Sequence, residues 1–440
     1  MPSPTSASSP AGGSAGARTA PAAATLGPLP TAADIEEAAQ RIADRVGRTA
    51  LERSTRLSEQ TGASVWLKRE DQQPVRSYKG RGAANLIGQL DSEQIWAGVV
   101  CASAGNHAQG VAHACATLGV GARIYLPATT PRQKRDRVAD IGGDWVEVVV
   151  GGRTYDEAAA AALADAERTG ATLVPAFDHP HTIAGQGTIA REISEDLPGP
   201  PDVVVVPCGG GGLLAGCLTW FGEQAPGVRV VAAEPAGAAS MMAATRAGEP
   251  VALAEIDRFV DGAAVQKVGR HTFEVVRRHT PELVAVPEGR ICTEMIRLYQ
   301  SEGIIAEPAG ALAPAALDAL GDLGGLTVVV VVSGGNNDLL RYPEVMERSL
   351  IHEGLKHYFL VDFPQEPGML RQFLDEVLGP DDDIALFEYV KRNNRETGPA
   401  LVGIELGARD DLAPLLDRMR ASSLQIEPIQ PDSPLFRFIL

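Results

Sequence analysis

"DVVVVPCGGGGLLAG", residues 202–216, joins an unbroken apolar run to four glycines and an apolar helical stretch. Consecutive valines predict a strand that is buried on both faces, since a strand with one wet face would alternate apolar and polar side chains. A glycine-rich turn from such a strand into a helix is typical of parallel β/α units. The stretch therefore predicts an α/β fold with parallel sheets covered by helices.

Similar short runs recur between Ala-rich helical stretches. They cover residues 64–68, 97–102, 122–127, 145–150, 228–234 and 326–333. These are too many units for one minimal sheet, so we expect two α/β lobes with a cleft between them, over residues 31–345. Thr31 is a candidate cap for the first helix. Residues 1–30 are rich in Pro, Ala, Ser and Gly and are expected to form a disordered tail.

The pattern changes near residue 350. Strand signals cover residues 357–363, 384–392 and 400–406 and return at the end of the chain, and helix signals cover residues 367–379 and about 410–420. The order β-α-β-β-α-β is the ferredoxin-like arrangement. We therefore expect a small, separate α+β domain over residues 351–440.

Charge and composition exclude several classes of protein. The net charge of −17 disfavours a general role on nucleic acid or an anionic membrane. No apolar run is long enough to span a bilayer. The five cysteines are odd in number, scattered and free of CxxC spacing, which is typical of reduced thiols in the cytoplasm.

Lys79 lies in an unusual setting, in the stretch "RSYKGRGA" (76–83). Small residues surround it, and Gly80 and Gly82 are expected to allow a ligand to come close. A desolvated lysine readily forms a Schiff base, so this one suits covalent attachment of a flat cofactor aldehyde. A lysine on a helix surface is the plain alternative.

Three glycine-containing loops follow apolar strands. "SAGNHAQG" opens a helix at Ser103, where backbone N–H groups can face an anion. "CGGGGLLAG" suits a phosphate cup, but Gly210, Gly212 and Ala215 also satisfy the G-x-G-x-x-A pattern of a dinucleotide site, with Glu234 about 20 residues on. "SGGNND" begins at Ser333 and by itself is a plain turn. The loops alone leave a phosphate cofactor and a dinucleotide both open.

"KREDQQPVRSYKGRGA" (68–83) closely resembles the cofactor-lysine segment of the threonine dehydratase branch of the fold type II, tryptophan-synthase-like pyridoxal-phosphate enzymes. The resemblance extends over roughly residues 32–340 and includes the stretches 177–193 and 303–317. It favours pyridoxal 5'-phosphate over a dinucleotide, because a nicotinamide enzyme has no use for such a lysine segment.

The resemblance implies a role for each matching residue. Lys79 would anchor the cofactor and act as the catalytic base, and Asn106 would bind the ring oxygen. Ser333 would face the ring nitrogen, where a neutral partner favours elimination over transamination, and Glu307 would lie close to the cofactor. The cofactor phosphate would be bound by Gly209, Gly210, Gly211, Gly212 and Leu213. The substrate carboxylate would be bound by Ser103, Ala104, Gly105, Asn106 and His107.

The resemblance also implies an activity: conversion of L-threonine to 2-oxobutanoate and ammonia, with inhibition by isoleucine and a homotetrameric assembly. "FPQEPGML" (363–370) resembles the ligand loop of ACT-like amino-acid-sensing domains, with Glu366, Gly368 and Met369 as candidate effector contacts. Related racemases bind a metal through a glutamate and an acidic residue six positions later. Here Ser240 stands at that distance from Glu234, so no metal is expected.

Other functions stay open. One is a serine racemase or a catabolic serine/threonine dehydratase. Another is a non-catalytic amino-acid sensor, which the intact set of Lys79, Asn106 and Ser333 disfavours. A nicotinamide oxidoreductase is the third. For the C-terminal domain, the alternative to regulation is a purely structural role in dimerisation.

Overall fold

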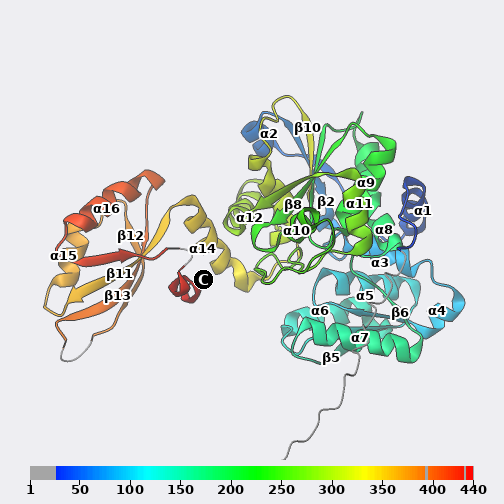
Figure 1. The fold of residues 1–440 in the computed structure, drawn as a ribbon, viewed down its shortest axis with the longest axis horizontal. Helices are drawn as coiled ribbons and strands as arrows, with labels where there is room; N and C mark the ends of the chain where they lie inside the picture. Colours follow the sequence, from blue (N-terminus) through cyan, green and yellow to red (C-terminus); the bar gives the residue numbers. More distant parts are fainter. Residues whose placement is uncertain (1–25, 392–394, 431–432, 440) are drawn as a thin grey trace, which may run out of the picture.

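The computed structural model describes residues 26–391, 395–430 and 433–439. They form a two-lobed body that one helix joins to a smaller C-terminal domain (Figure 1). Most of the expected N-terminal tail, residues 1–25, lies outside the described residues. Its last residues are packed rather than disordered, because Leu29 contacts the core of the larger lobe.

The large lobe is built on a six-stranded sheet in the order β1-β2-β10-β7-β8-β9. Its strands are β1 (Leu51–Arg53), β2 (Ser64–Arg69), β7 (Val203–Pro207), β8 (Arg229–Pro235), β9 (Glu282–Val286) and β10 (Thr327–Val332). Neighbouring strands are parallel except for the antiparallel pair of β1 and β2. The predicted strands at 64–68, 202–207, 228–234 and 326–333 are confirmed, whereas β1 and β9 were not predicted.

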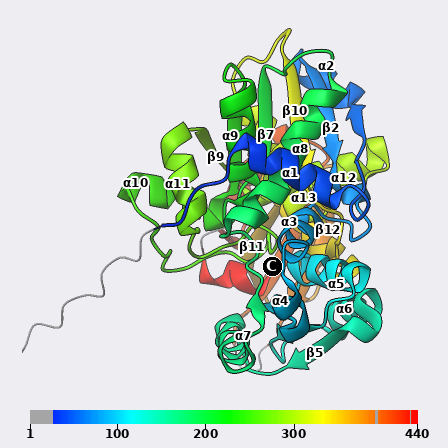
Figure 2. The same cartoon turned by 90° about the vertical axis from the view of Figure 1, so that its right-hand side faces the viewer.

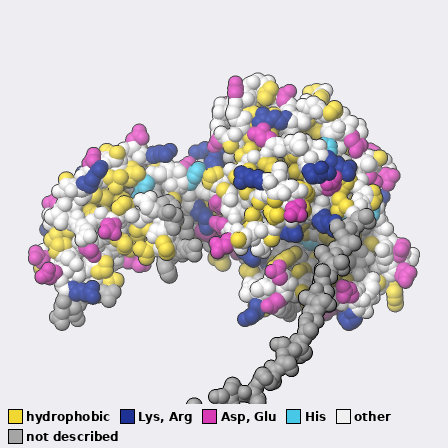
Figure 3. Space-filling view, viewed as in Figure 1, with side chains coloured by type: hydrophobic (Ala, Val, Ile, Leu, Met, Phe, Trp, Pro, Cys, Tyr) yellow, Lys and Arg dark blue, Asp and Glu magenta, His cyan; other side chains and the backbone are white. Residues whose placement is uncertain are grey.

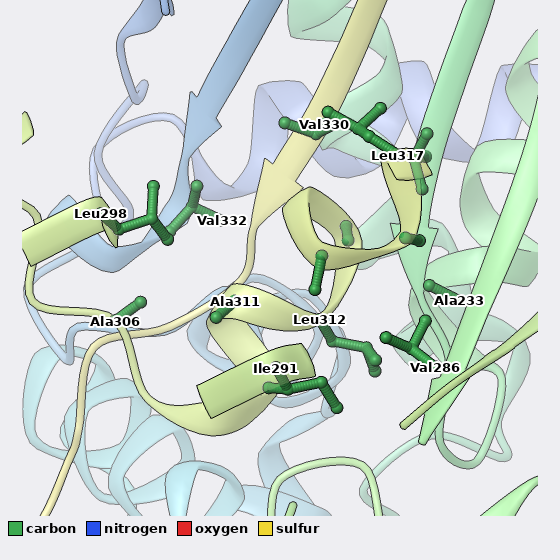
Figure 4. Close-up of a cluster of buried hydrophobic side chains, with 14 of the residues drawn as sticks. Ala233, Val286, Ile291, Leu298, Ala306, Ala311, Leu312, Leu317, Val330 and Val332 are labelled. Atoms are coloured by element: carbon green, nitrogen blue, oxygen red, sulfur yellow. The ribbon is translucent and has the colours of Figure 1, made fainter. Parts of the chain in front are cut away.

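The valine runs are buried on both faces of this sheet, as predicted. In β10, Val328, Val330 and Val332 pack into one core and Val329 and Val331 into the other. Figure 4 shows Val330 and Val332 facing side chains of the helices on the first face. Burying each such side chain stabilises the fold by about 1.5–3 kcal/mol, so the valines of the two strands contribute much of the stability of this lobe.

Helices cover both faces of the large sheet. They are α1 (Ala32–Ile42), α2 (Thr55–Thr61), α8 (Pro180–Asp196), α9 (Gly212–Gln224), α10 (Ser240–Ala247), α11 (Arg270–His279), α12 (Glu288–Glu302) and α13 (Pro308–Ala315). The predicted cap of the first helix is confirmed, because Thr31 accepts a hydrogen bond from the backbone N–H of Asp34. In Figure 2, α1 and α8 lie over the sheet on one side.

The small lobe has a four-stranded parallel sheet in the order β5-β4-β3-β6. Its strands are β3 (Val99–Ala102), β4 (Ala122–Leu126), β5 (Val146–Val150) and β6 (Thr172–Leu173), and its helices are α3 (Lys79–Ile87), α4 (Ser92–Ala97), α5 (Asn106–Leu118), α6 (Arg132–Gly142) and α7 (Tyr155–Thr169). Three of the strands match the predictions, and the two-residue β6 was not predicted. Helix α3 packs against both α5 and α8, so it joins the lobes.

The C-terminal domain has the predicted β-α-β-β-α-β order. It comprises β11 (Lys356–Pro364), α15 (Met369–Glu376), β12 (Asp383–Tyr389), β13 (Thr397–Glu405), α16 (Leu412–Ala421) and β14 (Gln425–Pro428). The strands form an antiparallel sheet in the order β12-β13-β11-β14. Side chains of α15 and α16, such as Phe373 and Leu415, share a core with one face of the sheet. The ferredoxin-like arrangement is confirmed.

Helix α14 (Tyr342–Glu353) links the two-lobed body to this domain and packs along α12. The hydroxyls of Thr293 and Ser349 are 2.9 Å apart, and Nη2 of Arg297 lies 3.0 Å from Oε1 of Glu353. Short 3₁₀ turns complete the chain: η1 (Glu70–Gln72), η2 (Gly143–Trp145), η3 (Ala236–Ala238), η4 (Ala316–Ala319), η5 (Leu339–Arg341), η6 (Arg409–Asp411) and η7 (Pro434–Phe438).

The surface carries many charged side chains of both signs (Figure 3). On the face drawn in Figure 3, acidic and basic side chains are interspersed over both parts of the molecule. Within the described ranges, every helix is too short or too polar to cross a lipid bilayer.

Candidate active site

Lys79 is the first residue of α3, and its half-buried side chain lies on the wall of a cavity. Its amine donates a hydrogen bond of 3.3 Å to the carbonyl oxygen of Ala176. The same nitrogen is 5.1 Å from the ring centroid of Tyr78, which also lines the cavity. These contacts hold the amine where it can meet a bound carbonyl compound.

One of the glycines next to Lys79 has a different purpose from the one expected. A Cβ at Gly82 would lie 2.4 Å from Nε2 of Gln186 on α8. At Gly80, a Cβ would lie 3.3 Å from Cγ2 of Val75. The expectation that Gly82 makes room for a ligand is wrong, because its open side faces α8. Gly82 lets α3 pack closely on α8, which fixes the position of the lysine at its start.

Arg81 is fully buried and was not singled out from the sequence. Its Nε lies 2.8 Å from Oε2 of Glu70, and its Nη1 lies 2.6 Å from Oε1 of Glu192. The buried amine of Lys68 is 2.7 Å from the other oxygen of Glu192. Burial works against ionisation of Glu192, but the charges and hydrogen bonds of Arg81 and Lys68 together outweigh it, and the pKa of the carboxyl is lowered. This network ties the start of α3 to η1 and α8.

The loop Gly209–Leu213 leads from β7 into α9, and crowding requires its glycines. A Cβ would lie 2.7 Å from the carbonyl oxygen of Ala263 at Gly209 and 2.4 Å from ring atoms of Phe177 at Gly210. Gly211 has a φ of +91°, which side chains rarely adopt. The first N–H groups of a helix lack intrahelical acceptors and carry its positive end. The loop therefore forms a bare cup that suits a phosphate.

Asn106, Glu307 and Asn336 form a hydrogen-bonded group. Nδ2 of Asn106 donates to Oε1 of Glu307 at 2.6 Å, and its Oδ1 accepts from Nδ2 of Asn336 at 2.8 Å. Burial raises the pKa of Glu307 to about 7, helped by the charge of Asp261 and opposed by the hydrogen bond from Asn106. The Glu307 carboxyl can therefore take up or release a proton near neutral pH.

Ser333 follows β10 and is buried beside the lysine segment. Its hydroxyl donates to the carbonyl oxygen of Ala309 at 3.0 Å. The backbone N–H of Tyr78 donates to the carbonyl of Ser333, and Ser77 pairs with Gly334 in an isolated bridge. The loop after β10 and the start of α3 are thus held together through their backbones.

The loop before α5 differs in part from the expectation. The backbone N–H of Ser103 donates to the carbonyl of Tyr125, so it is not available to an anion, and the N–H of Gly105 donates to the Ser103 hydroxyl. Nε2 of His107 lies 2.8 Å from the carbonyl oxygen of Val174. Burial, with a smaller contribution from a nearby lysine charge, lowers the pKa of His107 to about 4. The imidazole is therefore a neutral packing group.

The cavity brings residues from both lobes together. Five of the predicted residues line it: Lys79, Asn106, Gly209, Glu307 and Ser333. Five others were not predicted: Tyr78, Pro207, Gly262, Ala263 and Ala309. The remaining predicted residues are not part of its lining: Ser103, Ala104, Gly105, His107, Gly210, Gly211, Gly212 and Leu213. The loop containing Gly262 has no motif in the sequence that could have revealed it.

Comparison with known families agrees with this geometry. A model described as "Pyridoxal-phosphate dependent enzyme" matches residues 42–334, and one described as "C-terminal regulatory domain of Threonine dehydratase" matches residues 347–439. The chain belongs to the pyridoxal-phosphate-dependent threonine dehydratases. The sequence-based prediction of this family, of a lyase and of its cofactor is confirmed.

Individual relatives of this threonine dehydratase cover nearly its full length. It is 61% identical over 410 residues to the L-threonine dehydratase biosynthetic IlvA of Mycobacterium tuberculosis strain H37Rv, which is 93% of this chain and 96% of that protein. It is 54% identical over 413 residues to the same enzyme of Corynebacterium glutamicum, with 93% and 95% covered. The solved structure of the processed form of threonine deaminase isoform 2 from Solanum lycopersicum is similar with a TM-score of 0.69 and 39% identity, over 72% of this chain and 92% of that one.

The residues of the dehydratase fit pyridoxal phosphate. The cofactor needs an amine for its aldehyde, an anion cup for its phosphate and partners for its ring. The structure places Lys79, Asn106, Gly209 and Ser333 around one cavity, and the four glycines from Gly209 to Gly212 carry no side chain that could cover the N–H groups at the start of α9.

Glu234, which a dinucleotide site would need as a ribose partner, is engaged elsewhere. Its buried carboxylate accepts hydrogen bonds from the backbone N–H groups of Met241 and Met242 at 2.7 and 2.8 Å. Burial raises the pKa of Glu234 to about 7. Within the described part of the chain, no group of three or more His, Cys, Asp or Glu residues is placed to hold a metal ion.

The predicted effector residues of the dehydratase lie together at the start of α15. Gly368 precedes the helix with a φ of +97°, Glu366 is exposed and Met369 is the first helical residue. Gln365 holds the loop to the neighbouring strand, since its backbone N–H donates to the carbonyl of Glu396. The loop is therefore accessible from solvent.

Proposed function

We propose that this threonine dehydratase converts L-threonine to 2-oxobutanoate and ammonia in the first step of isoleucine biosynthesis, and that isoleucine inhibits it. The observation that carries the proposal is one cavity lined by the lysine, by the candidate ring partners and by Gly209, the first residue of the glycine cup, in a chain that matches a threonine dehydratase regulatory domain. The names of the relatives support the biosynthetic assignment.

Lys79 has two proposed tasks. It holds the cofactor through its amine and, once the substrate amine has replaced it, its lone pair takes the proton from Cα of threonine. When bound, pyridoxal phosphate would serve as the electron sink for the electron pair that remains on Cα after the proton has left. The packing of α3 on α8, together with the buried Arg81 network, fixes the start of α3, from which the lysine side chain lines the cavity.

The other residues bind and orient. The cup from Gly209 to Leu213 binds the phosphate, Asn106 donates to the ring oxygen and Ser333 offers its hydroxyl to the ring nitrogen. Near neutral pH the raised pKa of Glu307 lets it hold a proton beside Asn106. The substrate carboxylate is assigned to the loop from Ser103 to His107.

The elimination and the hydrolysis that follows it account for every atom of threonine. The Cα–H and Cβ–O bonds break, the hydroxyl leaves with a proton as water, and the enamine product is released. Water then hydrolyses its imine form to 2-oxobutanoate and ammonia. The elimination needs neither a metal nor an oxidant.

Regulation is assigned to the C-terminal domain. We propose that isoleucine binds at the loop formed by Glu366, Gly368 and Met369, where backbone at a helix start can meet a carboxylate. We also propose a homotetramer. A cytoplasmic location is supported by the five cysteines, which are all free and buried.

A second candidate is serine racemase. The structure of the maize serine racemase is similar with a TM-score of 0.68 and 32% identity, over 74% of this chain and 99% of that one. Because the dehydratase relatives are far more identical and cover the regulatory domain, the racemase is the weaker proposal.

A steady-state assay tests these proposals together. Keto acid formation is measured with L-threonine and with L-serine, each with and without isoleucine, and the serine reaction is analysed for D-serine. We expect faster turnover of threonine and inhibition by isoleucine. D-serine as the main product would make the enzyme a racemase, and no turnover of either substrate by the loaded protein would favour a non-catalytic sensor.

A further inference from the structure

Asn336 connects three parts of the active site. Its side-chain amide donates 2.8 Å hydrogen bonds to the carbonyl oxygen of Val75, before α3, and to Oδ1 of Asn106, at the start of α5. Its backbone N–H donates to Glu307. Asn336 itself lies on the loop after β10 of the large lobe, whereas α5 belongs to the small lobe. One residue thus holds both lobes at the cavity.

These contacts determine which way the amide of Asn106 points. Since Oδ1 of Asn106 accepts from Asn336, its Nδ2 must lie on the other side, where one N–H reaches Oε1 of Glu307 at 2.6 Å. In the flipped orientation an amide oxygen would face the carboxyl oxygen of Glu307, and two NH₂ groups would face each other. An asparagine amide carries two N–H donors, so the observed orientation leaves the second donor of Asn106 for a ligand in the cavity.

We propose that Asn336 is a positioning residue that acts through Asn106. It fixes the amide so that a donor, and not an acceptor, is presented to the ring oxygen of pyridoxal phosphate. The inference rests on the proposed role of Asn106. It assigns Asn336 no contact with the substrate or the cofactor.

Two variants test this inference against a matched control. Asn336→Ala removes the side-chain donors without adding charge. Asn336→Asp keeps the shape but turns the donor into an acceptor, which favours the flipped amide of Asn106. Asn337→Asp adds the same charge one residue away. There Nδ2 reaches the carbonyl of Ala306 at 3.5 Å, and Oδ1 accepts from the backbone N–H of Asp338 at 3.0 Å, a bond that an aspartate keeps.

The main readout is the binding of pyridoxal phosphate to the apoprotein, together with the visible spectrum of the bound cofactor as a function of pH. Neither needs a substrate. We expect both variants at Asn336 to weaken cofactor binding by about 5- to 100-fold, as the loss of a buried hydrogen bond does, and to shift the pH profile of the spectrum. Asn337→Asp should stay within about 2-fold of the wild type. Thermal unfolding of each variant separates a positioning effect from a failure to fold.

A double-mutant cycle tests the route of the effect. If Asn336 acts through Asn106, adding Asn336→Ala to Asn106→Ala should weaken cofactor binding little further. Fully additive losses would overturn the inference, as would a wild-type spectrum and affinity in Asn336→Asp. If the wild type instead fails to turn over threonine while the cycle behaves as expected, the proposed function falls and the positioning role stands.

Discussion

Replacing Arg81 with methionine removes the guanidinium that lies between two buried carboxylates. Glu70, whose side chain is fully buried, would keep only the hydroxyl of Thr49 at 2.6 Å and the amide of Gln73 at 3.3 Å. Glu192 would still have Lys68 at 2.7 Å. Breaking a buried ion pair from one side costs about 3–5 kcal/mol, because the remaining charge is left without a partner. We expect the free energy of unfolding of the catalytic body to fall by that amount.

Arg48→Met is the matched control. Arg48 is about half exposed and pairs with Glu195 at 2.6 Å, at the C-terminal end of α8 beyond Glu192. Surface pairs contribute about 0–1 kcal/mol, so the same substitution there should change stability little. The assay is urea unfolding of the cofactor-loaded proteins at neutral pH, followed by circular dichroism.

The pH dependence gives a second test of the same residue. In the wild type, Arg81 helps to lower the pKa of Glu192. The ion pair therefore stabilises the fold at pH values above 4.5, the ordinary pKa of the carboxyl group. This stabilisation is lost as the pH falls through the lowered pKa. The stability difference between wild type and Arg81→Met should therefore shrink as pH falls below the ordinary carboxyl pKa of 4.5. The reasoning fails if Arg81→Met is as stable as Arg48→Met, or if the difference grows on acidification.

Four further variants test the site and its regulation. Lys79→Ala should stay folded but lose the visible absorbance of covalently held cofactor and nearly all turnover; a borohydride-reducible adduct on another lysine would refute this. Gly211→Asp should weaken cofactor binding by at least about 10-fold, since a side chain at a φ of +91° is strained and its carboxylate repels a phosphate; unchanged affinity would move the phosphate elsewhere. Ser333→Ala should lower kcat by about 5- to 150-fold, equivalent to about 1–3 kcal/mol for a hydrogen bond, and a wild-type rate would remove Ser333 from the site. A chain that ends at Gly354 should keep threonine turnover and lose isoleucine inhibition; full non-competitive inhibition of that chain would place the effector site in the catalytic lobes.

The central strands could be predicted because burial on both faces restricts their residues to apolar types. The valines of β7 and β10 are buried on both faces, so each of them must be apolar. The missed strands lack this constraint: β1 (LER) and β9 (ELVAV) are edge strands with exposed, charged residues, and β6 has only two residues. Edge strands get their hydrogen bonds from a neighbour that local sequence does not reveal.

The site was predictable where a loop has its own signature and not where a side chain gains its role from distant partners. Lys79 and the glycine cup stand out locally, whereas Arg81 reads as a surface cation until α8 supplies Glu192, 111 residues later. Ala263 lines the cavity from a loop without a motif, so no local pattern marks it. The misjudged glycine follows the same logic, because Gly82 is matched to a partner on α8.

Helix α14 determines where the C-terminal domain of this enzyme could be replaced by that of a relative in a chimeric protein. Sequence similarity to the regulatory family begins at residue 347, yet Ser349 and Glu353 bind α12 of the catalytic body. A chimera joined at 347 would combine half of this helix with a foreign partner and lose the matching contacts. The helix ends at Glu353 and is capped by Gly354, which has a φ of +72°, and after Leu355 the first strand of the C-terminal domain begins at Lys356. This glycine is the natural splice point, and recombination between dehydratases should tolerate crossovers there better than a few residues upstream.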